Sequence, residues 1–187
     1  TDWEVIEGDS DFYATTKAFH NALQGKEQVL TEAMLEHYLD VNRANAERLR
    51  PAGDLVLIHD PQPAAMIEAR APEGTWVWRC HIDLSTPQRR VWTFLRRFVV
   101  RYDAAVFSLP AFAQQLPIPQ FLAYPSIDPL ADKNRRMSAK EVKKILDPLG
   151  VPDDKPILVQ VSRFDRFKDP IGVLNAYRLV KRYHDVR

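Results

Sequence analysis

The chain has 187 residues, 45% hydrophobic and 27% charged, which is the profile of a globular protein with a core of its own. Its 26 basic and 25 acidic residues leave a net charge of +1, so nothing in the charge favours nucleic acid or an anionic membrane as a partner. No apolar run approaches the roughly 18 residues of a membrane span and the N-terminus has no signal-peptide pattern, so we expect a cytoplasmic protein.

The N-terminal third predicts one short strand and two helices. Residues 3–6 are typical of a strand. Apolar residues recur at helical spacing over 12–23, and Gly25 is a natural stop. A second helix is expected to begin after Thr31, as its N-cap, and to end before Pro51.

The middle of the chain predicts a set of buried strands separated by helical segments. Ser85 and Gln88 form a capping-box pattern ahead of a helix that contains Trp92 and Leu95. Cys80 lies in an apolar run and is expected to be a buried thiol rather than a disulfide or metal ligand. An unbroken apolar run at 55–58 is typical of a strand buried on both faces, and further strands are expected at 75–78, 104–107 and 121–123.

The C-terminal part predicts a helix over 138–146, a strand over 157–161 and a last helix that Asp169 and Pro170 open as N-cap and first residue. Strands that alternate with helices indicate an α/β fold, with a Rossmann-like, mostly parallel sheet flanked by helices.

Ligands of such sheets bind beyond the carboxyl ends of the strands. Four polar segments directly follow predicted strands or apolar runs, and we expect them to form a site. They are His59-Asp60-Gln62, Arg79-His81-Asp83, Pro125-Ser126-Asp128 and Ser162-Arg163.

The segment 161–170 has two interpretations. Arg163, Lys168 and the free N–H groups at a helix start would form a cradle for a diphosphate. A charged surface turn has the same pattern. The segment resembles the opening strand and turn of the second domain in retaining B-type glycosyltransferases, and this resemblance favours the cradle, with Arg163 and Lys168 holding the diphosphate of a nucleotide sugar.

Four further segments, in order along the chain, are similar to the trehalose glycosyltransferring synthases and trehalose phosphorylases of that class. They are Phe19–Gly25, His59–Pro63, Trp78–Ser85 and Pro125–Leu130. The resemblance implies a catalytic position for His81 and sugar-binding roles for Asp60, Gln62, Arg79 and Asp83. From the pattern alone, His81 is equally consistent with a core histidine, and His59 with Asp60 could simply form a turn before Pro61.

The resemblance also implies how the chain is organised. Residues 1–150 would form an acceptor-side Rossmann-like domain without its opening strand, and residues 151–187 the start of a nucleotide-sugar-binding domain. Two complete domains need on the order of 300 residues, so we expect a fragment that is inactive by itself. We expect the strand at 157–161 to pair with the first domain's sheet or with another copy of the chain.

The implied reaction is reversible transfer of glucose from UDP-, ADP- or GDP-glucose to glucose, giving trehalose, with no cofactor and no metal ion. A trehalose phosphorylase that uses inorganic phosphate and a non-catalytic sugar-binding or oligomerising fragment remain alternatives. The expected partners are the nucleotide sugar, glucose and trehalose, with neither nucleic acid nor membrane, and the expected assembly is a homodimer.

Overall fold

The computed structural model describes residues 2–152 and 154–187 and divides into two compact units, the first reaching Ser126 and the second running from Ile127 to Arg187. Each unit is described by itself. The predicted domain boundary between residues 150 and 151 stays a prediction. No helix in the described ranges is long and apolar enough to cross a membrane.

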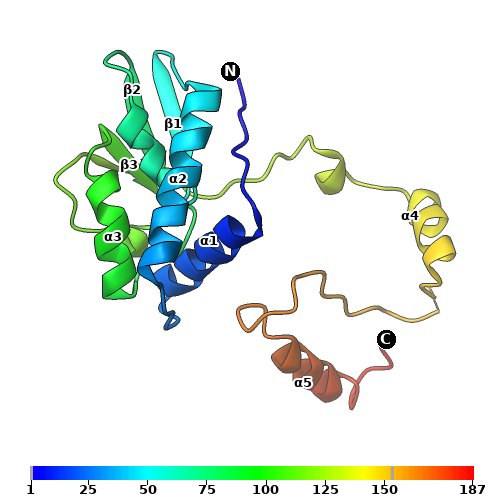
Figure 1. Cartoon of the computed structure of the whole chain (residues 1–187). Coiled ribbons are helices and arrows are strands. Elements are labelled where there is room, and N and C mark those ends of the chain that lie inside the picture. Colours follow the sequence, from blue (N-terminus) through cyan, green and yellow to red (C-terminus); the bar gives the residue numbers. More distant parts are fainter. Residues whose placement is uncertain (1, 153) are drawn as a thin grey trace. The chain divides into compact units, whose positions relative to one another are not determined.

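Two helices open the first unit, where the sequence predicts them (Figure 1). Helix α1 spans Ser10–Leu23 and helix α2 spans Glu32–Leu49. The hydroxyl of Thr31 accepts the Met34 N–H and caps α2, as predicted.

The prediction of a strand at residues 3–6 is wrong. This segment has no strand partner, and side chains of α2 bind its backbone instead. The Asn45 amide exchanges two hydrogen bonds with the backbone of Glu7, at 2.8 and 2.7 Å, and Arg48 donates to the Val5 carbonyl at 2.9 Å. A short segment of strand-like composition becomes a strand only if a neighbouring strand can pair with it.

A four-stranded parallel sheet follows, in the order β1-β2-β3-β4, and confirms the predicted α/β class. The strands span Leu55–His59, Thr75–Arg79, Ala104–Phe107 and Gln120–Leu122. Their connections contain the short 3-10 helix η1 (Ala64–Ala69), the helix α3 (Arg89–Val99) and the 3-10 helix η2 (Pro110–Phe112). Each connection returns the chain to the same end of the sheet, so the carboxyl ends of the strands lie along one edge.

The core lies on one face of this sheet. Val56, Ile58, Trp76 and Trp78 are buried there against apolar residues of α1, α2 and α3. The alternate residues of β1 face the other way, with Leu55 63% and Leu57 45% exposed. The prediction that this strand is buried on both faces is therefore wrong.

Helix α3 begins later than its predicted capping box. Gln88 is the N-cap residue but its side chain makes no cap hydrogen bond. The side-chain amide of Gln88 instead accepts the Gln28 N–H at 3.0 Å and donates to the Gln28 carbonyl at 2.9 Å. This amide therefore joins the start of α3 to the loop between α1 and α2.

The described part of the second unit contains the α-helices α4 (Ala139–Leu146) and α5 (Pro170–Val180), both at predicted positions. The 3-10 helices η3 (Asp132–Asn134) and η4 (Asp147–Leu149) flank α4. A capping box between Ser138 and Glu141 opens α4. Asp169 and Pro170 open α5 as predicted.

The prediction of a strand at residues 157–161 is also wrong. Among the described residues its backbone pairs only near its start, where the Leu158 N–H donates to the Arg187 carbonyl at 2.8 Å and the Arg187 N–H donates to the Pro156 carbonyl at 2.9 Å. One such exchange does not make a ladder, and the described sheet contains only β1 to β4. The apolar side chains of this segment are accordingly exposed, with Val161 at 93%.

Candidate active site at the carboxyl edge of the sheet

Polar residues from adjoining strands meet at the carboxyl edge of the sheet, as the strand-end rule predicts. His59 ends β1 and pairs in register with Arg79, which ends β2. Arg79 is in register with Val106 of β3, two residues before Ser108. Backbone register alone therefore brings together residues that lie 20 or more positions apart in the sequence.

His59 and His81 form a close imidazole pair. The Nδ1 atom of His59 lies 2.9 Å from Nε2 of His81, and the two ring planes are within 9° of parallel. His59 is half-buried and His81 is exposed. Burial lowers the pKa of His59, the neighbouring His81 and Arg79 lower this pKa further, and Asp60 opposes them. The Trp3 ring lies 5.9 Å from the His59 ring.

Asp60 forms the turn that carries the chain out of β1. Its φ of 65° lies in the left-handed region, which Asp tolerates better than most residues. Three hydrogen bonds fix it: its N–H donates to the Arg79 carbonyl at 2.8 Å, its carbonyl accepts the indole N–H of Trp78 at 2.9 Å, and its Oδ1 accepts the His81 N–H at 2.7 Å. Asp60 therefore holds the backbone of His81 against the end of β1.

Arg79 is a buried cation, 7% exposed. Its Nη2 atom donates to the hydroxyl of Ser108 at 3.2 Å and to the carbonyl of Ala123 at 2.7 Å. Its Nη1 atom is buried without a hydrogen-bond partner within the described ranges. The guanidinium thus joins the ends of β2, β3 and β4, and its predicted sugar-binding role stays a prediction.

Gln62 and Asp83 lie further along the two loops. The backbone carbonyl of Gln62 accepts the Asn42 amide at 3.0 Å, while its side-chain Oε1 is buried without a partner among the described residues. Asp83 makes a local turn, in which its Oδ1 accepts the Ser85 N–H at 2.8 Å. No hydrogen bond within the described ranges joins Arg79, His81 and Asp83 to one another through their side chains.

Helix α2 holds the loop after β1 in place through hydrogen bonds of Tyr38. The hydroxyl of Tyr38, a fully buried residue, donates to the Pro61 carbonyl at 2.8 Å and accepts the Ala65 N–H at 3.2 Å. Tyr102 makes a single comparable bond, to the Ala64 carbonyl at 2.9 Å. Burial raises the pKa of both phenols, so they remain neutral donors.

Cys80 is a free and fully buried thiol, as predicted. Its sulfur lies 3.7 Å from the Ile82 carbonyl, and burial raises the pKa of the thiol. A thiol that stays protonated is a poor nucleophile and a poor metal ligand. No group of three or more potential metal-binding side chains occurs in the described part of the chain.

The predicted diphosphate cradle lies in the second unit, at the start of α5. Arg163 forms an ion pair with Asp165 at 3.1 Å, and the Lys168 carbonyl accepts the side chain of Gln160 at 2.7 Å. Asp169, with φ 43°, caps α5 by accepting the Gly172 N–H at 3.0 Å. The geometry brings both cations to the loop before this helix, and their diphosphate role stays a prediction.

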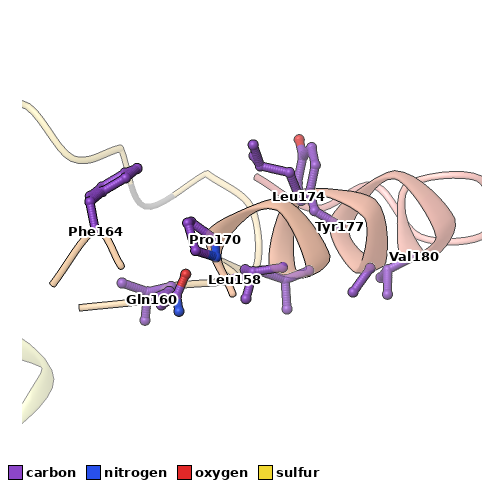
Figure 2. Close-up of a pocket in the computed structure, with 10 residues that line it drawn as sticks. Leu158, Gln160, Phe164, Pro170, Leu174, Tyr177 and Val180 are labelled. Carbon is purple, nitrogen blue, oxygen red and sulfur yellow. The ribbon is translucent and has the colours of Figure 1, made fainter. Parts of the chain in front are cut away.

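An apolar groove of about 590 Å³ lies beside α5 (Figure 2). Figure 2 shows that its labelled wall residues come from α5 and from the loop before it, with Phe164, Leu174 and Tyr177 among them. Neither Arg163 nor Lys168 lines it. The groove is thus an exposed apolar face of this unit rather than the predicted cradle.

Two members of the strand-edge cluster were given no role by the sequence. His59 belongs to a segment that the sequence predicts to form the site, but no role follows for it, because nothing local indicates that its ring faces His81. Ser108 directly follows β3, so the same strand-end rule that selected Asp60 could have selected it.

Comparison with known proteins gives concordant matches. Residues 1–114 match the family model described as "Trehalose synthase, N-terminal domain". The chain is 49% identical over 187 residues to a protein named Trehalose synthase from Pyrococcus horikoshii, 46% over 183 residues to one from Thermococcus litoralis, and 42% over 188 residues to one from Rubrobacter xylanophilus. Each alignment covers 96% of this chain but only 44% or 45% of the relative, so the chain spans less than half of their length.

Proposed function

Because this chain belongs to the trehalose synthase N-terminal domain family, we propose that it supplies the acceptor side of a retaining glycosyltransferase. The proposed reaction moves glucose from a nucleoside diphosphate glucose to a second glucose and forms trehalose reversibly. The donor would be UDP-, ADP- or GDP-glucose, with no metal ion or cofactor. The proposal places the protein in the cytoplasm, as a homodimer.

The observation that carries this proposal is the polar cluster at the carboxyl edge of the sheet. His81 is exposed there beside His59, and the Asp60 carboxylate fixes the His81 backbone at 2.7 Å. A ring whose backbone is already fixed loses less conformational entropy when it is positioned against a sugar ring. In the proposed reaction His81 contacts the reacting glucose, and Asp60, Gln62, Arg79 and Asp83 orient the sugar hydroxyls.

Charge is the second requirement of this chemistry. Glycosyl transfer passes through an oxocarbenium-like centre beside a departing diphosphate, so cations next to the leaving group stabilise the transition state. Arg163 and Lys168 would supply these charges. The existing ion pair between Arg163 and Asp165 is exposed, so exchanging that carboxylate for a diphosphate costs little.

The first test measures trehalose formation by the full-length protein with His81→Ala. We expect the rate to fall by about 10²–10⁴, the range for loss of a positioned catalytic side chain, with the melting temperature nearly unchanged because the ring is exposed. His184→Ala is the control for loss of an exposed histidine elsewhere. A large fall in melting temperature with normal activity would instead support a structural histidine.

The second test measures donor affinity in the Arg163→Ala, Lys168→Ala double variant. Losing two charge-assisted contacts should cost about 3 kcal/mol or more, a hundredfold in Kd. Arg166→Ala is a matched control, because this neighbouring cation lies over the Phe167 ring and is not assigned to the diphosphate. An affinity within twofold of the wild type would refute the cradle.

A third test separates the proposed reaction from its alternatives. The full-length protein is incubated either with nucleotide glucose and glucose, or with trehalose and inorganic phosphate. Release of glucose 1-phosphate without nucleotide would identify the protein as a phosphorylase rather than a synthase.

We propose that the 187-residue chain alone forms no trehalose, and product above an Arg163→Ala control of the same length would contradict this.

A further inference from the structure

The contact between His59 and His81 requires a hydrogen between two ring nitrogens. Nδ1 of His59 and Nε2 of His81 are 2.9 Å apart, the distance of a normal N–H···N hydrogen bond. A neutral imidazole has one donor and one acceptor nitrogen, so only one of these two atoms carries the proton. If both did, the two hydrogens would collide and the pair would separate.

This constraint determines what His81 can present to a ligand. When His59 donates through Nδ1, His81 accepts at Nε2 and must carry its own proton on Nδ1. When His81 donates through Nε2, its Nδ1 is an acceptor. In both cases Nδ1 is the His81 nitrogen that the pair leaves available, and its donor or acceptor character is set by the partner ring.

The surroundings keep His59 in place for this role. It ends β1 and lies in register with the buried Arg79, and the Trp3 ring lies beside it at 5.9 Å. His81, by contrast, is exposed and follows the end of β2. The half-buried ring on the strand can therefore orient the exposed ring on the loop, rather than the reverse.

We propose that His59 is a positioning residue, which fixes the ring orientation and the tautomer of His81. This inference rests on the proposed function in assigning His81 to the reacting sugar, but the hydrogen-bonded pair itself does not depend on that assignment. His59 need not contact the sugar, because its effect passes through the shared proton.

Two substitutions of His59 in the full-length protein separate orientation from packing. His59→Phe retains a ring that can lie beside Trp3 but removes both nitrogens. His59→Asn places an amide atom on Cγ, where Nδ1 stood, and can restore the hydrogen bond to Nε2 of His81. We expect kcat to fall by about 10–100-fold in His59→Phe, the range for loss of a supporting hydrogen bond, with KM and melting temperature little changed. His59→Asn should recover kcat to within about fivefold.

A second measurement reads the pair without using activity. In the full-length protein labelled with ¹⁵N at histidine, we expect nuclear magnetic resonance to find a single His81 tautomer and a coupling between the two facing nitrogens. In His59→Phe the His81 signals should move to those of a tautomer mixture.

The outcomes divide as follows. Loss of kcat in the Phe variant with recovery in Asn, together with the change at His81, supports the proposal. A wild-type kcat in the Phe variant, equal losses in both variants, or a His81 spectrum indifferent to His59 would overturn it. If no variant, the wild type included, forms trehalose, the proposed function fails while the spectra still decide whether the pair exists.

Discussion

Replacing Asp60 tests the turn on which the strand-edge cluster depends. Alanine at this position loses the hydrogen bond that the His81 N–H donates to Oδ1 and must adopt a φ of 65°. A hydrogen bond to a charged group contributes about 1.5–3 kcal/mol when buried, and partial exposure reduces this to roughly 1–2 kcal/mol. The left-handed backbone adds about 1 kcal/mol for alanine. Asp60→Ala should therefore destabilise the first unit by about 2–3 kcal/mol, given the sum of these two effects.

Two further variants at the same position separate the two contributions. Asp60→Asn retains an acceptor oxygen and the tolerance of a left-handed backbone, so it should cost less than about 1 kcal/mol. Asp60→Gly loses the hydrogen bond but adopts this φ without strain. The expected order of stability is wild type, Asn, Gly, Ala.

Thermal unfolding followed by circular dichroism and by fluorescence of the buried Trp76 and Trp78 gives the measurement. A difference of 2–3 kcal/mol should lower the Tm by about 6–12 °C for a unit of this size. If Asp60→Ala were as stable as Asp60→Asn, neither the hydrogen bond nor the backbone strain would contribute as argued, and the turn would not be what holds His81.

Four other substitutions test interactions within the first unit. Tyr38→Phe should lower the free energy of unfolding, measured by chemical denaturation, by about 2–4 kcal/mol, and Tyr102→Phe should lower it by about 1–2 kcal/mol. The first substitution leaves two buried backbone groups without a hydrogen bond and the second leaves one, so equal losses would contradict this reasoning. The pKa of His37 is raised, chiefly by its hydrogen bond to Asp9, so the stabilisation should be present below the unfolded pKa of about 6.5 and lost as pH rises through the folded pKa. His37→Gln should thus lower the Tm at pH 5.5 and leave it unchanged at pH 9, and a constant difference across that range would contradict the pair. Gly74→Ala should prevent normal folding of the first unit, because its φ is 85° and a Cβ would overlap the backbone carbonyl of Gly53, just before β1. An unchanged Tm would refute that geometry.

Much of the fold follows from local chemistry that the sequence displays. Thr31 and Asp169 cap helices at the positions expected, because an N-cap needs only its own side chain and the next turn of backbone. Segments rich in apolar residues identified the four strands of the described sheet. Their alternation with helices implied a parallel sheet, since a parallel pair needs a crossover connection. The sequence also placed the candidate site at the carboxyl edge of that sheet.

Errors occurred where a structure depends on a distant partner. Residues 3–6 and 157–161 have strand-like composition, but in the described parts of the chain no strand pairs with either. The Arg48 side chain binds the backbone of the first segment, and the C-terminal Arg187 binds the backbone of the second. Gln88 fits a capping box, yet its amide bonds to Gln28, which is 60 residues away in the sequence. The burial of β1 on a single face is likewise a property of what packs against the sheet.

The sequence by itself therefore determined the class of fold, the starts of α2 and α5 and the edge at which the polar residues gather, because these depend on residues close in the chain. The tertiary structure alone decided which side chains meet there. The parallel register of β1 and β2 places His59 beside Arg79. The hydrogen bond from the His81 N–H to the Asp60 carboxylate then holds the loop after β2 near the end of β1, where the facing nitrogens of the two imidazoles lie 2.9 Å apart. No local pattern encodes that distance, because it results from hydrogen bonds between segments about 20 residues apart.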